Sequence, residues 1–226
     1  MAFQDYSQIP AHRDTTGLDR TPRRRSLYRN GAKRALDIVL VVATLPFTLP
    51  ILLLLMVFAS LDGHGPIYRQ PRLGRGGRIF RMVKIRTMVP DAHALLERHL
   101  AADCEARREW DETQKLKCDP RITPAGQVLR KCSLDELPQL WNVLTGDMSL
   151  VGPRPMMVGQ EKLYPGTAYF ALRPGITGPW QISDRNESSF AARAGFDNRY
   201  LATLSLLVDF RILVRTVMVV LRGTGY

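Results

Sequence analysis

A run of 24 residues, from Ile38 to Leu61, contains no charged side chain. A helix needs about 20 apolar residues to cross the hydrocarbon core of a bilayer, so this run is long enough to enter a membrane. Pro46 and Pro50 lie in its middle, four positions apart and therefore on one helix face. Because each proline removes a backbone hydrogen bond and favours a kink, the run is predicted to bend at Pro46 and Pro50.

Basic residues flank the run on both sides. Lys33 and Arg34 precede it, and a series of seven basic residues follows between Arg69 and Arg86. The positive-inside tendency places both flanks on the cytoplasmic side, which predicts a re-entrant membrane helix-hairpin over residues 31–63. A single spanning helix, with the rest of the chain on the other side, stays as the alternative.

The rest of the chain divides around this segment. Residues 1–30 are polar, rich in Arg, Asp and Thr and without a sustained period, so they are predicted to form a disordered basic tail. Residues 64–226 are predicted to form one cytoplasmic domain, which carries the candidate catalytic residues. Its fold class is predicted to be α+β and mostly helical, as a small domain on the membrane surface.

The net charge of +11 calls for an anionic partner: nucleic acid, anionic lipid or a phosphorylated substrate. A nucleic-acid binder would not explain the uncharged run, and the sequence shows no recognised nucleic-acid module. We therefore expect the lipid bilayer as a partner and no nucleic acid.

Several helical segments are predicted in the domain. The charged stretch from Asp91 to Lys117 favours one or two amphipathic helices, and residues 125–130 favour a short helix. Residues 200–221 are apolar but hold charges, which makes a lipid span expensive. Their basic residues share one helix face, so an amphipathic interfacial helix and a core helix with a solvated basic stripe both fit; these residues are Arg211, Arg215 and, just beyond, Arg222.

The segment from Arg81 to Arg86 alternates basic and apolar residues. This period of two is typical of a strand and puts Lys84 and Arg86 on one face. Such a face could bind phosphates. It could equally be solvated or lie over lipid headgroups, and the periodicity does not decide.

Two adjacent carboxylates, Asp135 and Glu136, follow Ser133 in the spacing of a capping box. In that interpretation Ser133 caps a helix, Glu136 reaches back to it, and Asp135 lies at a helix N-terminus that favours its ionised form. Capping and catalysis are compatible here. The helix is predicted to end at Gly146 and to bury Leu137, Leu140, Trp141 and Leu144.

Arg154 stands between two prolines, Pro153 and Pro155. The prolines restrict the backbone, so the Arg154 guanidinium would meet a phosphate at low entropic cost. Carboxylates, a basic strand and a restrained guanidinium on one chain with a membrane segment suggest chemistry on a phosphate ester.

These motifs resemble those of the bacterial sugar transferase family, the monotopic phosphoglycosyl transferases. The resemblance extends from about residue 31 to the end and is strongest to members of exopolysaccharide pathways that prime undecaprenyl phosphate with galactose or glucose phosphate. The matching segments are residues 33–37, 65–70, 84–88, 133–144, 146–155 and 173–178.

The resemblance implies a transfer of sugar 1-phosphate from a UDP-sugar to undecaprenyl phosphate at the cytoplasmic face of the bacterial inner membrane, which would initiate exopolysaccharide repeat-unit synthesis. Asp135 would attack the β-phosphorus, release UMP and form an aspartyl-phosphosugar. Mg²⁺, with Asp135 as a ligand, would neutralise phosphate charge, and Glu136 would position the metal or manage a proton. Lys84, Arg86 and Arg154 would hold the phosphoryl oxygens.

Two positions depart from the family's pattern. Leu49 replaces the serine of its Ser-Pro bend, and Asp184 replaces the glycine that usually precedes Arg185 and Asn186. Thr44 or Thr48 could supply the missing hydroxyl. The sequence leaves open which sugar is carried and whether the chain forms a homo-oligomer, and a membrane-bound assembly protein of the same fold without chemistry remains the alternative function.

Overall fold

The computed structural model describes residues 27–61, 63–114, 116–183 and 189–221. The helical elements are η2 (Tyr28–Ala32), α1 (Lys33–Ser60), η3 (Arg75–Gly77), α2 (Ala92–Ala102), α3 (Cys104–Thr113), α4 (Pro124–Lys131), η4 (Leu134–Glu136), α5 (Gln139–Thr145), η5 (Gln160–Leu163), α6 (Ala168–Ala171), α7 (Arg193–Thr203) and α8 (Leu206–Leu221). The strands are β1 (Ile67–Leu73), β2 (Ile79–Ile85), β3 (Ser149–Val151) and β4 (Gly175–Thr177). The predicted mostly helical α+β class is confirmed.

The predicted disordered tail of residues 1–30 lies largely outside the described residues. At its end, Tyr28 already belongs to the π-helix η2, which continues directly into α1. The helical segment therefore begins a few residues before the predicted boundary at residue 31.

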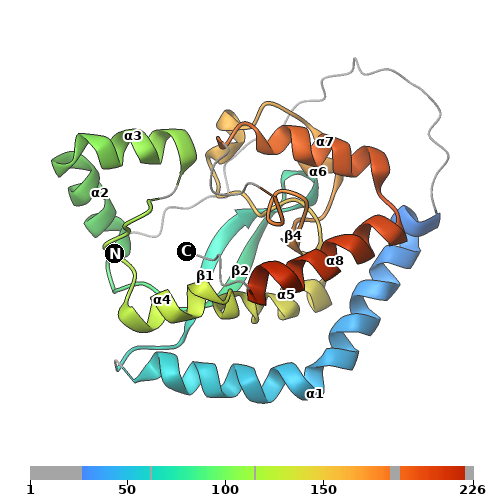
Figure 1. Cartoon of the computed structure of the whole chain (residues 1–226), viewed down its shortest axis with the longest axis horizontal. Helices are drawn as coiled ribbons and strands as arrows, with labels where there is room; N and C mark the ends of the chain where they lie inside the picture. The colour runs from blue at the N-terminus through green and yellow to red at the C-terminus, as the bar shows by residue number, and fades with distance from the viewer. Residues whose placement is uncertain (1–26, 62, 115, 184–188, 222–226) are drawn as a thin grey trace.

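Helix α1 is one element of 28 residues that contains both Pro46 and Pro50. Figure 1 shows it bent. Its first half packs Val41 against Val143 of α5, and its second half packs Leu52, Leu55 and Ala59 in a cluster with Leu129 of α4. The threonine hydroxyls donate to carbonyls one turn back, Thr44 to Leu40 at 2.9 Å and Thr48 to Thr44 at 3.1 Å. These are not the carbonyls four residues before each proline, so the threonines favour bending without replacing the lost bonds.

Most of the apolar surface of α1 is exposed. Phe47, at 76% exposure, and Leu54, at 70%, are examples from the middle of the helix. Among the described residues, α1 is the one helix long and apolar enough to cross a membrane. A helix of this composition would normally bury such a surface, either in protein or in lipid.

The N-terminal part of α1 is fixed to the domain by polar contacts. Asp37 is buried and accepts hydrogen bonds from Ser149 Oγ at 2.7 Å and from the Leu150 backbone nitrogen at 3.1 Å. Arg34 donates to the backbone carbonyls of Val143 and Leu144. The first turns of α1 are therefore held against β3 and α5.

Strands β1 and β2 form an antiparallel hairpin with Ile67 opposite Ile85 and Leu73 opposite Ile79. Figure 1 shows this hairpin at the centre of the molecule. The side chain of Asn142 on α5 bonds to the edge of β2, accepting from the Val83 nitrogen and donating to the Arg81 carbonyl, each at 2.9 Å. This amide fixes β2 against α5 and so sets where Lys84 projects.

Strands β3 and β4 pair in parallel, with Ser149 opposite Gly175 and Val151 opposite Thr177. Gly152 follows β3, and a Cβ atom at this position would lie 2.3 Å from the carbonyl oxygen of Arg173. Only glycine permits this approach. The contact sets the backbone immediately before Pro153.

The predicted helices of the middle region are confirmed: α2 and α3 occupy the stretch from Asp91 to Lys117, and α4 covers the predicted short helix. The helix predicted over residues 200–221 is two elements, because α7 ends before Leu204 and α8 begins at Leu206. Arg222 lies outside the described residues. Trp141 was predicted to be buried, and this was wrong: it is 63% exposed, while its neighbour Val143 fills the core beside Met148.

Candidate active site

The two carboxylates lie in a short 3₁₀ turn, η4, between α4 and α5. Ser133 enters this turn in a left-handed conformation, at φ 56°, and its side chain makes no capping hydrogen bond. The predicted capping box is therefore wrong, and the α-helix begins only at Gln139. The turn aims Glu136 at strand β2 instead of back at Ser133.

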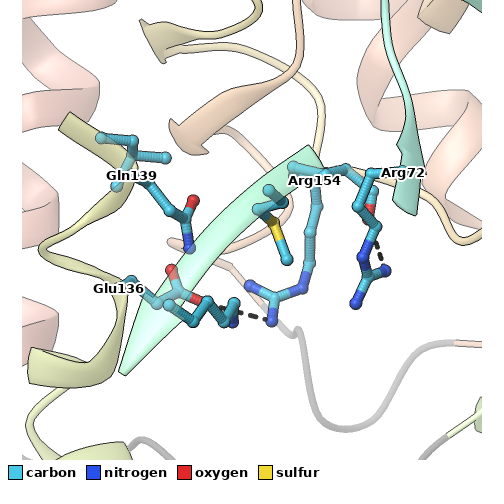
Figure 2. A pocket seen from close by; sticks show the side chains of 8 residues that line it. Arg72, Glu136, Gln139 and Arg154 are labelled. Carbon is cyan, nitrogen blue, oxygen red and sulfur yellow. Dashed lines mark hydrogen bonds and ion pairs between the residues drawn. The ribbon is translucent and has the colours of Figure 1, made fainter. Parts of the chain in front are cut away.

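Lys84 on β2 is the cation that both carboxylates share. Its Nζ lies 2.8 Å from Glu136 Oε1 and 3.8 Å from Asp135 Oδ2. Arg154 approaches from the other side, with Nη2 3.5 Å from the same Glu136 oxygen. Figure 2 shows Glu136 and Arg154 pointing toward one another across the end of the pocket. Four of the predicted site residues thus meet in one place.

The two carboxylates differ in their surroundings. Asp135 is 5% exposed and, within the described part of the chain, its carboxylate accepts no hydrogen bond. Burial raises its pKa, and the charge of Lys84 opposes this only in part. For Glu136, burial also acts upward, but Lys84 and Arg154 outweigh it and lower its pKa to about 2. Glu136 is the fixed counter-ion, and Asp135 is the more basic and less engaged carboxylate.

Arg130 supports Asp135 from α4. It is partly buried, burial lowers its pKa, and the nearby Asp135 carboxylate opposes that shift. Its Nε donates to Thr87 Oγ1 at 2.8 Å, which holds the side chain in place. Arg130 is a site residue that no sequence motif marks.

A small pocket opens beside the carboxylates, and residues from β1, β2, β4, η4, α5 and the Pro-Arg-Pro segment surround it. Its polar wall is predominantly cationic, which suits an anionic ligand. The lining residues are Arg72, Met82, Lys84, Glu136, Gln139, Arg154, Pro155 and Ile176.

Arg72 on β1 lines the pocket, although in the sequence it is one of the basic residues that flank the apolar run. It donates to the Pro155 carbonyl at 3.0 Å and to Gln70 Oε1 at 2.6 Å. Burial, with the nearby Arg154 charge, lowers its pKa to about 10. Arg72 and Arg154 are two guanidiniums of like charge with few acidic partners nearby, an arrangement that favours binding of an anion.

Arg86 does not reach this pocket. Its Nε donates to the Gly65 carbonyl at 2.8 Å and its Nη2 to the Ala59 carbonyl at 3.0 Å, so it holds the C-terminal end of α1. Strand β2 ends at Ile85, and the alternation that predicted a shared face with Lys84 does not continue beyond it.

The candidate ligands for Mg²⁺ at the pocket are the carboxylates of Asp135 and Glu136. Among the described residues no group of three or more His, Cys, Asp or Glu side chains could hold a metal. Mg²⁺ is commonly bound by one or two carboxylates together with substrate phosphates. Asp135, whose oxygens are not committed to hydrogen bonds with the described residues, fits this mode, whereas Glu136 is paired with Lys84.

Comparison with known proteins gives the same family that the sequence motifs resemble. The family model described as bacterial sugar transferase matches residues 28–223. The chain is 48% identical over 195 residues to a UDP-galactose-lipid carrier transferase of Erwinia amylovora and 44% identical to an undecaprenyl-phosphate galactose phosphotransferase of Salmonella typhimurium, covering 85% of this chain and 41% of each relative. It is 42% identical over 197 residues to the exopolysaccharide production protein ExoY of Sinorhizobium fredii, covering 86% and 87%.

The chain spans about two fifths of the length of the first two of these relatives and most of the length of the third. The family match covers nearly all the described residues, including the carboxylate pair and the pocket. This chain belongs to the bacterial sugar transferase family.

Proposed function

We propose that this protein is a phosphoglycosyl transferase that moves a sugar 1-phosphate from a UDP-sugar to undecaprenyl phosphate and so initiates exopolysaccharide repeat-unit synthesis. The observation that carries the proposal is the buried Asp135 beside a cationic pocket formed by Lys84, Arg72 and Arg154. The names of the relatives, which include a galactose phosphotransferase and an exopolysaccharide production protein, support the same reaction class.

The reaction is a double displacement. An Asp135 carboxylate oxygen attacks the β-phosphorus of the UDP-sugar, and the bond from this phosphorus to the bridging oxygen breaks. UMP leaves with the electron pair, and an aspartyl-phosphosugar remains. A phosphate oxygen of undecaprenyl phosphate then attacks the same phosphorus, which forms the lipid diphosphate sugar and releases the Asp135 carboxylate.

The cations of the pocket address the main obstacle, which is repulsion between an anionic nucleophile and an anionic phosphate. Lys84 and Arg154 are held in place by Glu136 and can bind the phosphoryl oxygens, whose charge shifts during transfer. Arg72 contributes a further guanidinium. Mg²⁺ held by Asp135 and the substrate phosphates would supply additional charge neutralisation.

Two exposed apolar surfaces support the proposed membrane arrangement. One covers α1, and the other is the outer face of α8, whose exposed residues include Leu207, Phe210 and Val214. We propose that α1 is re-entrant and that α8 lies in the interface, so that the lipid phosphate and a water-soluble nucleotide meet at the cytoplasmic face of the inner membrane.

Trapping of the covalent intermediate tests the reaction. The purified full-length protein is incubated with UDP-sugars labelled in the sugar and with Mg²⁺, and the adduct is located by peptide mass spectrometry. We expect a phosphosugar on Asp135, and none in Asp135→Asn. Asp111→Asn, an exposed position on α3, is the matched control. Turnover that survives in Asp135→Asn contradicts the assignment, and a wild-type protein that never releases UMP favours the assembly protein.

A further inference from the structure

Gln139 is a buried residue of the pocket wall whose amide nitrogen has no hydrogen-bond partner among the described residues. It is 1% exposed and is the first residue of α5. Its Nε2 is buried and makes no hydrogen bond with any of the residues that the structure describes. Figure 2 shows the carboxamide turned into the space beside Glu136. Such unsatisfied groups are rare in folded proteins and call for an explanation.

The other polar groups of the pocket are largely engaged. Lys84 and Arg154 both contact Glu136, and two nitrogens of Arg72 donate to neighbouring oxygens. The buried groups left over are donors, Arg72 Nε and Gln139 Nε2. Figure 2 shows Arg72 and Gln139 on opposite sides of the site. A ligand that satisfies both must therefore present acceptor oxygens on two sides.

We propose that Gln139 binds the donor substrate directly, donating an Nε2 hydrogen to a non-bridging phosphoryl oxygen of the UDP-sugar. The proposal rests on the proposed function. Because the polar groups around the pocket are mostly cationic, the most anionic part of the substrate belongs there. A neutral amide adds a donor without adding another positive charge that would compete with the phosphate for the Asp135 carboxylate.

Gln139→Leu, which removes the amide and keeps nearly the same volume, tests the proposal. Binding of UDP is measured by calorimetry in the full-length protein, and binding of UDP-sugar is measured in the Asp135→Asn background without lipid. We expect both affinities to fall by about tenfold, the usual consequence of losing one hydrogen bond to a charged group. Gln127→Leu, the same change at an exposed position on α4, is the control.

Thermal unfolding of the same variants separates binding from folding. Since Leu removes a buried donor without a partner, we expect Gln139→Leu to unfold at the wild-type temperature or above it. A lower unfolding temperature with unchanged affinities would overturn the proposal in favour of a structural role. Weaker binding of UDP-sugar with unchanged binding of UDP would place the contact on the sugar and overturn the phosphoryl assignment.

The experiments distinguish a wrong proposed function from a wrong assignment of Gln139. If the wild-type protein binds no UDP-sugar and releases no UMP, the proposed function fails and the Gln139 inference falls with it. If the wild-type protein is active and Gln139→Leu matches it in affinity and rate, only the Gln139 inference is overturned.

Discussion

Lys84 Nζ donates to Glu136 Oε1 at 2.8 Å while it stays 3.8 Å from Asp135 Oδ2. This asymmetry gives two adjacent carboxylates different properties. Glu136 is held ionised by its ammonium partner, and Asp135 is left buried with a raised pKa. A double displacement needs this division, because the nucleophile must be available while the cations that bind phosphate stay in position.

Replacing Lys84 tests whether Asp135 and Glu136 have these different roles. We expect Lys84→Met to lower the rate of UMP release by about 10²-fold, because a positioned charge is lost from the transferring phosphoryl group. The change also leaves Glu136 without its main partner and costs about 1–3 kcal/mol in stability. Lys84→Met combined with Glu136→Leu should recover stability and not rate, as measured by thermal unfolding and nucleotide release. Recovery of both would show that Lys84 acts only through the fold.

Arg86 and Arg154 should give opposite results. Arg86→Met removes hydrogen bonds to the Ala59 and Gly65 carbonyls, so we expect a lower unfolding temperature and a near-normal rate for the folded fraction. Arg154→Met should unfold near the wild-type temperature and lose about 10²-fold in rate. Rates are normalised to the folded protein measured by size-exclusion chromatography. A specific rate that falls equally in both variants contradicts the placement of Arg86 outside the site.

Asp197 gives a pH dependence of stability that is separate from catalysis. It is 4% exposed, and burial raises its pKa from 3.8 to about 6, although the Tyr164 hydrogen bond and Arg193 oppose this shift. The folded state therefore holds the proton more tightly than the unfolded state. The contribution of Asp197 to the free energy of unfolding is fully present below pH 3.8, and it declines by roughly 3 kcal/mol as the pH rises through 6.

Asp197→Asn tests whether stability falls as the pH rises. The amide oxygen can still accept from Tyr164 but does not titrate, so the variant should gain stability relative to the wild type between pH 4.5 and pH 7.5. The measurement is the unfolding temperature of both proteins across this range, with Asp111→Asn as the exposed control. A stability difference that does not change with pH would contradict the raised pKa.

The Asp209 carboxylate connects α8 to the N-terminal helical segment, and replacing it should cause a large loss of stability. Asp209 on α8 is buried and accepts from Tyr28 at 2.6 Å, from Tyr200 at 2.6 Å and from Lys33. Replacing it removes the direct ion-pair partner of Lys33, so we expect Asp209→Leu to cost about 3–5 kcal/mol, and Tyr28→Phe only about 1 kcal/mol. Thermal unfolding in detergent measures both. Similar small shifts would mean that η2 and α8 are not coupled through this carboxylate.

The sequence was sufficient to predict the elements whose causes are local. The uncharged run predicts α1, and the alternation around Lys84 predicts β2. Gly146 ends α5 in a left-handed conformation, as predicted. Asp135 and Arg154 could be singled out because their chemistry is visible in adjacent residues.

The errors came from contacts between distant segments. The predicted capping box at Ser133 does not form because the Glu136 carboxylate pairs with Lys84 instead of the Ser133 backbone. Lys84 lies 52 positions away in the sequence. A capping bond contributes about 1 kcal/mol, less than the cost of burying a carboxylate without a partner. Arg72 and Gln139 reach the pocket from β1 and α5, and nothing in their immediate sequence marks them.

The bend of α1 gives the last prediction. If Pro46 and Pro50 make the membrane segment re-entrant, cysteines placed at both of its ends in a cysteine-free background should be labelled from the cytoplasmic side. Suitable positions are Arg29, in η2, and Gly65, an exposed residue shortly after α1 where a Cβ atom meets open space. Restoring both backbone donors with Pro46→Ala and Pro50→Ala straightens the helix, because alanine permits the missing i to i−4 bonds.

We expect this double variant to expose the cysteine at Gly65 to a membrane-impermeant reagent from the opposite side. It should also lose transferase activity, because the pocket no longer faces the nucleotide. Phe47→Ala, a neighbouring change that leaves the prolines intact, should keep same-side labelling. Opposite-side labelling in the protein with both prolines would instead establish a single spanning helix. In that case the bend is a feature of helix shape, and the site must reach the lipid phosphate from the side on which α1 emerges.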